Sequence, residues 1–481
     1  MWTLLWIGAC TRPCPTGSAL NSAGLCELLP EDTASTDTAD GATDTGGETT
    51  SGLPLSLGDP IVEVGSTYDP QSQSFAEWVD AVVISDTEAV VVGVSGAALI
   101  DIESFEIVRE YATNRAYRVD ADADSRIAIA GTVDEGLRRI DLDSGDVLRK
   151  NDGPEDVGHA DVSIDGGVIA VAWRSEGLWL LDTDLNTLSI VDAAAATAAV
   201  IRGERALYTD GLALILLDVS DPRSPAELDR TDLPAAGVDL DFDGEQVAVS
   251  LGGRGVSLYT VEGDQLTESG SLSVPGSAQG VALDGEYLWI GAWEVTALAW
   301  LGAGGPVVIG HEEPQFSAMA VGAYNGTALV ADWMSATVLR RVDGLAGPEL
   351  HTASQLTFQR DTPAQLSVVN HGAFPLRFSI DGVSNGYSVE PEELSIAPGS
   401  GGVIVVTPPS GSAPNSALLW SSDDPDEVSG TLPLLQASSG VGTAHDDFEL
   451  LGFSWPDTSL STHRLSDYQG KALFLAYWAD Y

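Results

Sequence analysis

The chain has 481 residues, which is too many for one compact core, so two to four domains are expected. It carries 72 acidic and 21 basic residues, giving a formal charge of −51, so nucleic acid is excluded as a partner because phosphate binding needs a cationic surface. No run of 18 or more apolar residues occurs, so no membrane-spanning segment is expected.

The chain begins with an apolar stretch that ends in Ile7-Gly8-Ala9-Cys10. This resembles the lipobox of bacterial lipoproteins. The resemblance implies that residues 1–9 are a signal peptide, that Cys10 carries a lipid anchor, and that the protein is attached to a membrane in the bacterial cell envelope. No Lys or Arg precedes the apolar stretch, which suggests a start codon further upstream.

Residues 10–55 are rich in Thr, Asp, Gly and Ser and contain the other two cysteines, Cys14 and Cys26. Outside the cytoplasm these two thiols are expected to form a disulfide, with free thiols as the alternative. The rest of the segment is predicted to be an acidic, self-repelling linker.

Between residues 75 and 350, a pattern of short alternating strands and Asp or Gly turns recurs seven times, about every 40 residues. Each unit offers four strands, which predicts a seven-bladed β-propeller. A stacked sandwich or two smaller propellers would give a similar period. The sequence LILLDVSDPRSP at residues 214–225 resembles the LVIVD-type repeat of bacterial surface propellers.

Two acidic runs within the repeats have the alternating carboxylates of a calcium loop. They are Asp120-Asp122-Asp124 and Asp239-Asp241-Asp243. The first has Ser125 where such a loop needs Gly, and the second has Ser250 where it needs Glu. Both runs also fall at a hairpin turn, where Asp is common, so turns are predicted and no metal site is.

Strand counting places two loops of each blade on one face of the ring: the loop that enters the blade and the loop between its second and third strands. The aromatic and polar residues predicted around this mouth are Trp78, His159, Trp173, Arg174, Trp293, Glu294 and Trp333. Such a group suits a protein or carbohydrate partner. The alternative is that the tryptophans pack between blades. No catalytic group or cofactor is predicted in the propeller.

Residues 355–437 show longer alternating runs, about seven strands, which predict an immunoglobulin-like β-sandwich. The segments Asn370-His371-Gly372, Ala397-Pro398-Gly399 and Ser421-Ser422-Asp423-Asp424-Pro425 resemble modules of the ASH and HYDIN kind. That resemblance implies a spacer or adhesion module without catalysis.

Residues 440–481 resemble the opening of the redoxin family, which includes peroxiredoxins and thiol-disulfide proteins. The resemblance lies in Asp447-Phe448-Glu449-Leu450, then in residues 465–471 (LSDYQGK), then in a final apolar run that contains Tyr477, Trp478 and Ala479. It implies an incomplete thioredoxin-like α/β segment whose catalytic cysteine would follow Tyr481. A truncated sequence, a degenerate gene and a UGA codon for selenocysteine are the three explanations.

The fold class expected is therefore mainly β, with a propeller, a sandwich and a partial thioredoxin-like segment. The function expected is that of a surface lipoprotein that binds or displays a partner without catalysis. The alternative is a membrane-tethered thiol or selenol oxidoreductase, in which the propeller recruits the substrate.

Overall fold

The computed structural model describes residues 18–20, 26–28, 55–67, 77–133, 136–150, 160–302, 305–314, 316–358, 362–410, 415–436, 449–454 and 457–464. Every regular element in these ranges is a β-strand. They contain no helix that is long and apolar enough to cross a membrane.

Seven four-stranded antiparallel sheets form the larger domain. Blades 1 and 2 consist of β5 (Trp78–Val83), β6 (Glu88–Gly93), β7 (Gly96–Asp101) and β8 (Glu106–Tyr111), then β9 (Ala116–Asp122), β10 (Ile127–Thr132), β11 (Gly136–Asp141) and β12 (Val147–Arg149). Blades 3 and 4 consist of β13 (Asp161–Asp165), β14 (Val168–Ala172), β15 (Leu178–Asp182) and β16 (Thr187–Val191), then β17 (Ala196–Arg202), β18 (Arg205–Asp210), β19 (Ala213–Asp218) and β20 (Ala226–Asp232).

The remaining three blades follow the same strand order. Blades 5 and 6 consist of β21 (Asp239–Phe242), β22 (Gln246–Ser250), β23 (Val256–Glu262) and β24 (Gln265–Leu272), then β25 (Gly280–Asp284), β26 (Tyr287–Gly291), β27 (Thr296–Trp300) and β28 (Val307–Glu312). Blade 7 consists of β29 (Ala320–Tyr324), β30 (Thr327–Ala331), β31 (Ala336–Arg341) and β4 (Ile61–Ser66).

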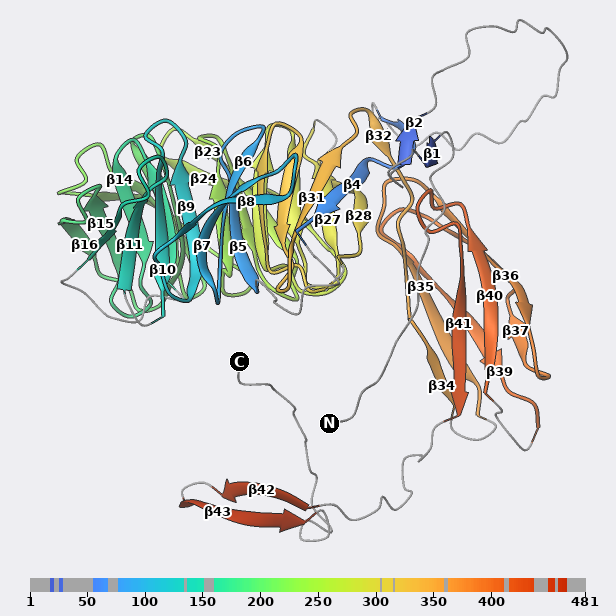
Figure 1. The fold of residues 1–481 in the computed structure, drawn as a ribbon. Coiled ribbons are helices and arrows are strands. Elements are labelled where there is room, and N and C mark those ends of the chain that lie inside the picture. Colours follow the sequence, from blue (N-terminus) through green and yellow to red (C-terminus); the bar gives the residue numbers. More distant parts are fainter. Residues whose placement is uncertain are drawn as a thin grey trace, which may run out of the picture.

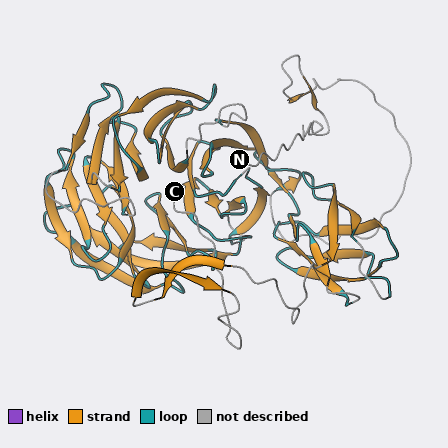
Figure 2. Cartoon of the chain, turned by 60° about the horizontal axis from the view of Figure 1, so that its bottom comes forward, coloured by secondary structure: helices purple, strands orange, loops and turns teal. Residues whose placement is uncertain are grey.

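The seven sheets close into a ring, so the fold is a β-propeller, as expected. The inner strands contact one another in succession from β5 to β29, and β29 contacts β5. Figure 2 shows the sheets set around a common centre. A single ring excludes the stacked sandwich and the pair of smaller propellers.

The outer strand of blade 7 corrects the predicted domain boundary at residue 75. It is β4, from the predicted linker side, which pairs antiparallel with β31 so that Glu63 faces Leu339. The ring is therefore closed by a strand from the opposite end of the domain. A search for sequence repeats misses this strand, because it precedes blade 1 in the sequence although it completes blade 7 in the structure.

The cores lie between neighbouring blades and are built from the middle strands. In β6, Val90, Val91 and Val92 are fully buried, because a sheet between two others is covered on both faces. Two glycines permit the tightest approach between inner strands. A Cβ at Gly280 would lie 2.8 Å from the Ala320 Cα, and one at Gly322 would lie 2.7 Å from the Ala81 carbonyl oxygen.

Residues 350–436 form a two-sheet β-sandwich with one shared core. One sheet has the order β33 (Leu350–Thr352), β35 (Ala364–Asn370), β39 (Gly401–Thr407), β37 (Ser388–Glu390). The other has the order β34 (Leu356–Phe358), β41 (Ser429–Gln436), β40 (Ser416–Ser422), β36 (Leu376–Val383), β38 (Glu393–Ile396). Alternate side chains such as Ile404 and Val406 point into the core, which explains the period of two in the sequence.

The sandwich lies against the rim of the propeller beside blades 6 and 7 (Figure 1). Ala373 of the sandwich packs in the same buried cluster as Ile61 and Ile309 of the propeller. Nearby, β3 (Ser56–Leu57) pairs in parallel with β32 (Leu345–Ala346). The buried Asn370 amide fixes the corner, because it accepts the N–H groups of Glu349 and Gly372 and donates to two carbonyl groups.

Two short hairpins complete the described part. The first pairs β1 (Ser18–Leu20) with β2 (Cys26–Leu28), and the second pairs β42 (Glu449–Ser454) with β43 (Asp457–Arg464). Cys10, Cys14, Tyr477, Trp478 and Ala479 lie outside the described residues, so the lipid anchor, the disulfide and the redoxin strand stay predictions. The α/β character expected of the tail is not seen in its described hairpin, which is all β.

Candidate functional site

Four loops on one face of the propeller share a backbone arrangement. They connect the second and third strands of blades 3, 5, 6 and 7, and we call them the mouth loops: residues 173–177, 251–255, 292–295 and 332–335. In each loop one residue has a positive φ and donates its N–H to a carbonyl group at the start of the next blade. The four donor and acceptor pairs are Arg174 and Ala196, Gly252 and Ala278, Trp293 and Ala318, and Trp333 and Trp78.

The backbone at these four positions favours glycine. Their φ angles are 48° at Arg174, 59° at Gly252, 60° at Trp293 and 76° at Trp333. A residue with a Cβ pays about 1–2 kcal/mol for this left-handed conformation, whereas glycine adopts it freely. Gly252 shows that the loop can be built with glycine, so its backbone does not require the large side chains of the other three loops.

The structure separates the predicted mouth residues into two groups. Arg174, Trp293 and Glu294 are exposed, with Trp293 46% exposed, and Trp333 is half-buried. Trp78 and Trp173 are buried at 3% and 4% exposure, each in a core cluster.

The prediction that Trp78 and Trp173 line a binding surface is therefore wrong. For Trp173 the alternative, packing between blades, is correct, and Trp78 likewise packs in a core cluster. His159 lies outside the described residues.

Arg254 was missed by the sequence analysis. It is exposed in the mouth loop of blade 5, beside the glycine that occupies the position of Trp293 and Trp333. Aligning the loops on their positive-φ residue would have found it. The described mouth therefore offers one partly exposed indole with exposed guanidinium and carboxylate groups, a mixture suited to a protein surface.

The central channel is lined by aspartates that fasten one blade to the next. Each accepts the N–H of a residue on the inner strand of the following blade, or just beyond it, at 2.6–2.9 Å. The aspartates are Asp80, Asp120, Asp161, Asp165, Asp239, Asp241 and Asp284. They therefore satisfy inner-strand N–H groups that have no sheet partner on that side.

These carboxylates surround two arginines in two layers of the channel. Arg118 is electrostatically coupled to Asp80, Asp161 and Asp239. Further along the inner strands, Arg202 is coupled to a second set, Asp120, Asp241, Asp165 and Asp122. In each layer the carboxyl groups outnumber the single arginine, so one cation cannot neutralise them all. How strongly each carboxyl group is protonated therefore depends on its burial.

Burial raises the pKa of several channel carboxyl groups. Desolvation raises the pKa of Asp80 to about 7, although Arg118 opposes the change. The pKa of Asp161 lies well above its usual range because of burial and of the nearby Asp239. Burial disfavours the charged form of Arg118, but the three carboxylates around it outweigh that effect and raise its pKa.

Asp80 gives the stability of the propeller a defined pH dependence. Its folded pKa of about 7 exceeds the ordinary aspartate pKa of 3.8, so its contribution is complete below about pH 4 and is lost as the pH rises through 7. The Asp80→Asn variant does not titrate there. Between pH 4 and 8 its free energy of unfolding should rise relative to that of wild type, with a slope of at most about 1.4 kcal/mol per pH unit. Urea unfolding at several pH values measures this difference, and a difference independent of pH would contradict the assignment.

The ends of the two acidic runs act as turns, as predicted, whereas Asp120, Asp239 and Asp241 lie on strands and bond the next blade. Asp122 Oδ1 accepts the N–H groups of Asp124 and Ser125, and Asp243 Oδ1 accepts those of Glu245 and Gln246. Among the described residues, one group of three carboxylates comes close enough to share a metal ion, and it lies outside the channel. It consists of Glu349, Asp424 and Asp426, where the sandwich meets the propeller.

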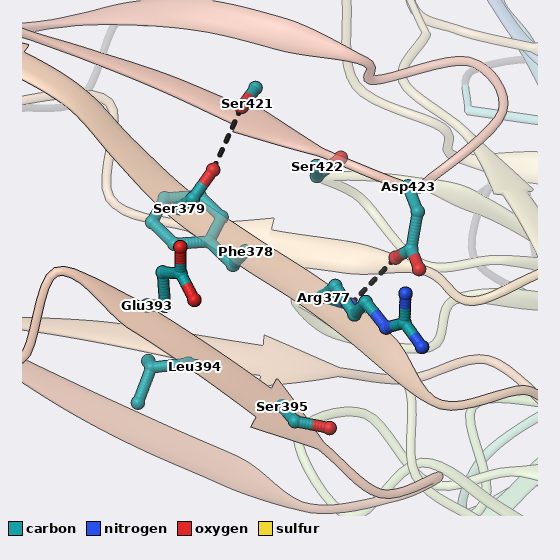
Figure 3. Close-up of a pocket in the computed structure, with 9 residues that line it drawn as sticks. All are labelled: Arg377, Phe378, Ser379, Glu393, Leu394, Ser395, Ser421, Ser422 and Asp423. Atoms are coloured by element: carbon teal, nitrogen blue, oxygen red, sulfur yellow. Dashed lines mark hydrogen bonds between the residues drawn. The ribbon is translucent and has the colours of Figure 1, made fainter. Parts of the chain in front are cut away.

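A polar groove of about 660 Å³ lies on the second sheet of the sandwich (Figure 3). Its polar groups largely bond one another. The Arg377 N–H donates to Asp423 at 2.6 Å, and the hydroxyl groups of Ser379 and Ser421 lie 2.9 Å apart. Since these groups are already paired, the groove offers a ligand fewer unused polar atoms than the mouth does.

Comparison with known proteins shows no family for the chain. No protein-family model matches the chain, and no curated protein matches it. Among solved structures, the β-propeller domain of Cps50 (Swd1) from Myceliophteria thermophila is 13% identical, with a TM-score of 0.49, and the match covers 58% of this chain and 99% of that one.

Two further solved structures are similar over the same part of the chain. The WD40 β-propeller domain of Doa1 is 11% identical, with a TM-score of 0.47, over 59% of this chain and 98% of that one. The computationally designed Ika8 protein is 13% identical, with a TM-score of 0.45, over 60% and 95%. The propeller fold itself follows from the strand order and the closed ring.

Proposed function

We propose that the protein binds a protein partner through the mouth loops of its propeller. One observation carries this proposal: Trp293, which is 46% exposed, occupies a backbone position that favours glycine, and the half-buried Trp333 occupies the equivalent position on the next blade. A side chain kept against a conformational cost, and exposed to water, is best explained by what it contacts outside the chain. Tryptophan and arginine are also the side chains that contribute most at protein interfaces.

The proposed setting is the bacterial cell envelope, with Cys10 lipidated and the acidic segment acting as a tether. The lipobox resemblance and the likeness of residues 214–225 to LVIVD-type repeats support it. The sandwich is proposed to be an immunoglobulin-like spacer of the ASH kind. In support, the Asn370 and Asp424 of its motifs both bond backbone groups where the two domains join.

Photo-cross-linking tests the mouth directly. A photoreactive amino acid is placed at position 293 and, as a matched control, at position 324. Tyr324 is 48% exposed, like Trp293, but lies in the hairpin between β29 and β30, on the opposite face. In cells of the source organism, position 293 should give one saturable product that an excess of unlabelled protein suppresses. Equal labelling from both positions would contradict a binding mouth.

A second proposal is that the chain belongs to a membrane-tethered redoxin-like oxidoreductase. It is supported by the strand β42, which begins at Glu449 within the Asp-Phe-x-Leu motif of the resemblance. The test is the gene sequence after codon 481. An in-frame UGA followed by the rest of a redoxin domain would support it. Any other sequence would contradict this second proposal and would leave binding as the one proposed function.

A further inference from the structure

Three carboxyl groups converge where the sandwich meets the propeller. Glu349 lies in the connection between the two domains, just before β33, and Asp424 and Asp426 lie in the loop between β40 and β41. One oxygen from each lies within 4.8 Å of the others. Glu349 is 2% exposed and Asp424 is fully buried, whereas Asp426 is exposed, so the cluster is open to solvent on one side only.

Two oxygens of this cluster have no hydrogen-bond donor. Both Glu349 Oε2 and Asp424 Oδ1 are buried and accept no hydrogen bond, although Glu349 Oε2 lies 3.5 Å from His311 Nδ1. The other oxygen of Asp424 accepts the Leu350 N–H at 2.6 Å, which fixes the direction of the carboxylate. The channel aspartates, in contrast, accept backbone N–H groups. A buried carboxylate oxygen without a partner costs several kcal/mol unless something else bonds it.

Among the described residues, no Lys or Arg forms an ion pair with the cluster. The ion pair recorded for Glu349 is with His311 Nδ1, at 3.5 Å. His311 is 4% exposed, and burial lowers its pKa to about 4, so this imidazole is neutral at pH 7. Asp59, on the propeller side, adds further negative charge.

We propose that Glu349, Asp424 and Asp426 bind a calcium ion that fastens the sandwich to the propeller. The donors are all carboxylate oxygens, which suit a hard divalent cation. The three donor oxygens lie within 4.8 Å of one another, which is no farther apart than two Ca–O bonds of about 2.4 Å allow. The unpartnered oxygens are the ligands, and the exposed Asp426 marks the side from which the ion enters.

The ion would join segments that are far apart in the sequence. Glu349 belongs to the connection that leaves blade 7, and its N–H is held by the Asn370 side chain. Asp424 and Asp426 belong to the loop between β40 and β41, near the end of the sandwich in the sequence. Calcium would therefore set how rigidly the sandwich is held on the propeller. The mouth loops take no part, so this inference is independent of the proposed binding function.

The test uses the full-length protein, freed of metal with a chelator and titrated with calcium chloride in a calorimeter at constant ionic strength. Magnesium chloride and zinc chloride are titrated in parallel. The variants Glu349→Gln and Asp424→Asn remove one ligand charge each and keep the shape of the side chain. The matched controls are the exposed neighbours Glu392→Gln and Asp423→Asn, which remove the same charge from the same domain.

We expect one calcium-dependent binding event, weakened at least about 10-fold in Glu349→Gln and Asp424→Asn and unchanged in both controls. Calcium should also raise the melting temperature of the wild type and not that of the two site variants. Without metal, the site variants should melt at or above the wild-type temperature, because an amide removes part of the repulsion among Glu349, Asp424, Asp426 and Asp59.

Three results would overturn the proposal. The first is no calcium binding, which would mean that protons alone neutralise the cluster. The second is calcium binding that the site variants retain, and the third is a site filled by zinc in preference to calcium. A variant that melts far below the metal-free wild type would likewise show that these carboxylates act within the fold and not toward an ion.

Discussion

Replacing Arg118 with methionine should destabilise the propeller by roughly 2–4 kcal/mol at pH 8. Arg118 is the cation of a channel layer that also holds Asp80, Asp161 and Asp239. Without it the three carboxylates face one another with no positive charge among them. Loss of one partner from a fully buried ion pair costs about 3–5 kcal/mol, and the half-buried position of Arg118 reduces the expected cost.

The pH dependence of this loss identifies its cause. At pH 5 the channel carboxyl groups take up protons, since the pKa of Asp80 is already about 7 in the presence of Arg118. The penalty for Arg118→Met should therefore be smaller at pH 5 than at pH 8. Arg254→Met, in an exposed mouth loop, is the control and should change stability little at either pH. An equal penalty for Arg118→Met at both pH values would show that lost packing, and not charge, is responsible.

Deleting residues 1–67 should abolish cooperative unfolding of the propeller. The deletion removes β4, which is the fourth strand of blade 7, and it removes Ile61 from a buried cluster shared with blade 6. It also leaves β31 as an unpaired edge, which can pair with other molecules. We expect a chain that aggregates or elutes as oligomers on size exclusion and shows no sharp thermal transition.

The control is a deletion of residues 1–54, which leaves β3 and β4 in place. This shorter deletion should elute as a monomer and melt as sharply as the full chain. If the two deletions melted at the same temperature, β4 would not close the ring. The comparison separates loss of the closing strand from loss of the acidic segment before it.

The blade pattern could be predicted from the sequence because it is local. A hairpin such as that of β21 and β22 is formed by residues close together in the sequence, so its own pattern predicts its turn and its buried face. The closing strand β4 could not be predicted in this way, because its partner β31 lies at the other end of the domain. The carboxylates where the two domains meet could not be predicted for the same reason, since Glu349 and Asp424 come together only when the two domains pack.

The tryptophans of the mouth show a second limit. Trp78, Trp173 and Trp293 lie at comparable distances from strand ends, so their position in the repeat does not reveal exposure. Trp173 turns inward against Trp179, with ring centroids 5.0 Å apart, whereas Trp293 remains in solvent. Of the channel aspartates, the sequence marked only Asp120, Asp239 and Asp241, as turn or metal candidates. Their bonds to the next blade could not be predicted, because these bonds form only in the closed ring.

The affinity of the cross-linked partner for the Trp293→Gly variant tests the central claim most directly. Gly252 shows that glycine suits this backbone position, so the melting temperature should not fall. We predict that binding weakens by at least about 30-fold, as expected for loss of an interface tryptophan worth about 2 kcal/mol or more, while Tyr324→Ala on the opposite face binds as the wild type does. Unchanged affinity of Trp293→Gly would contradict a binding mouth on this propeller.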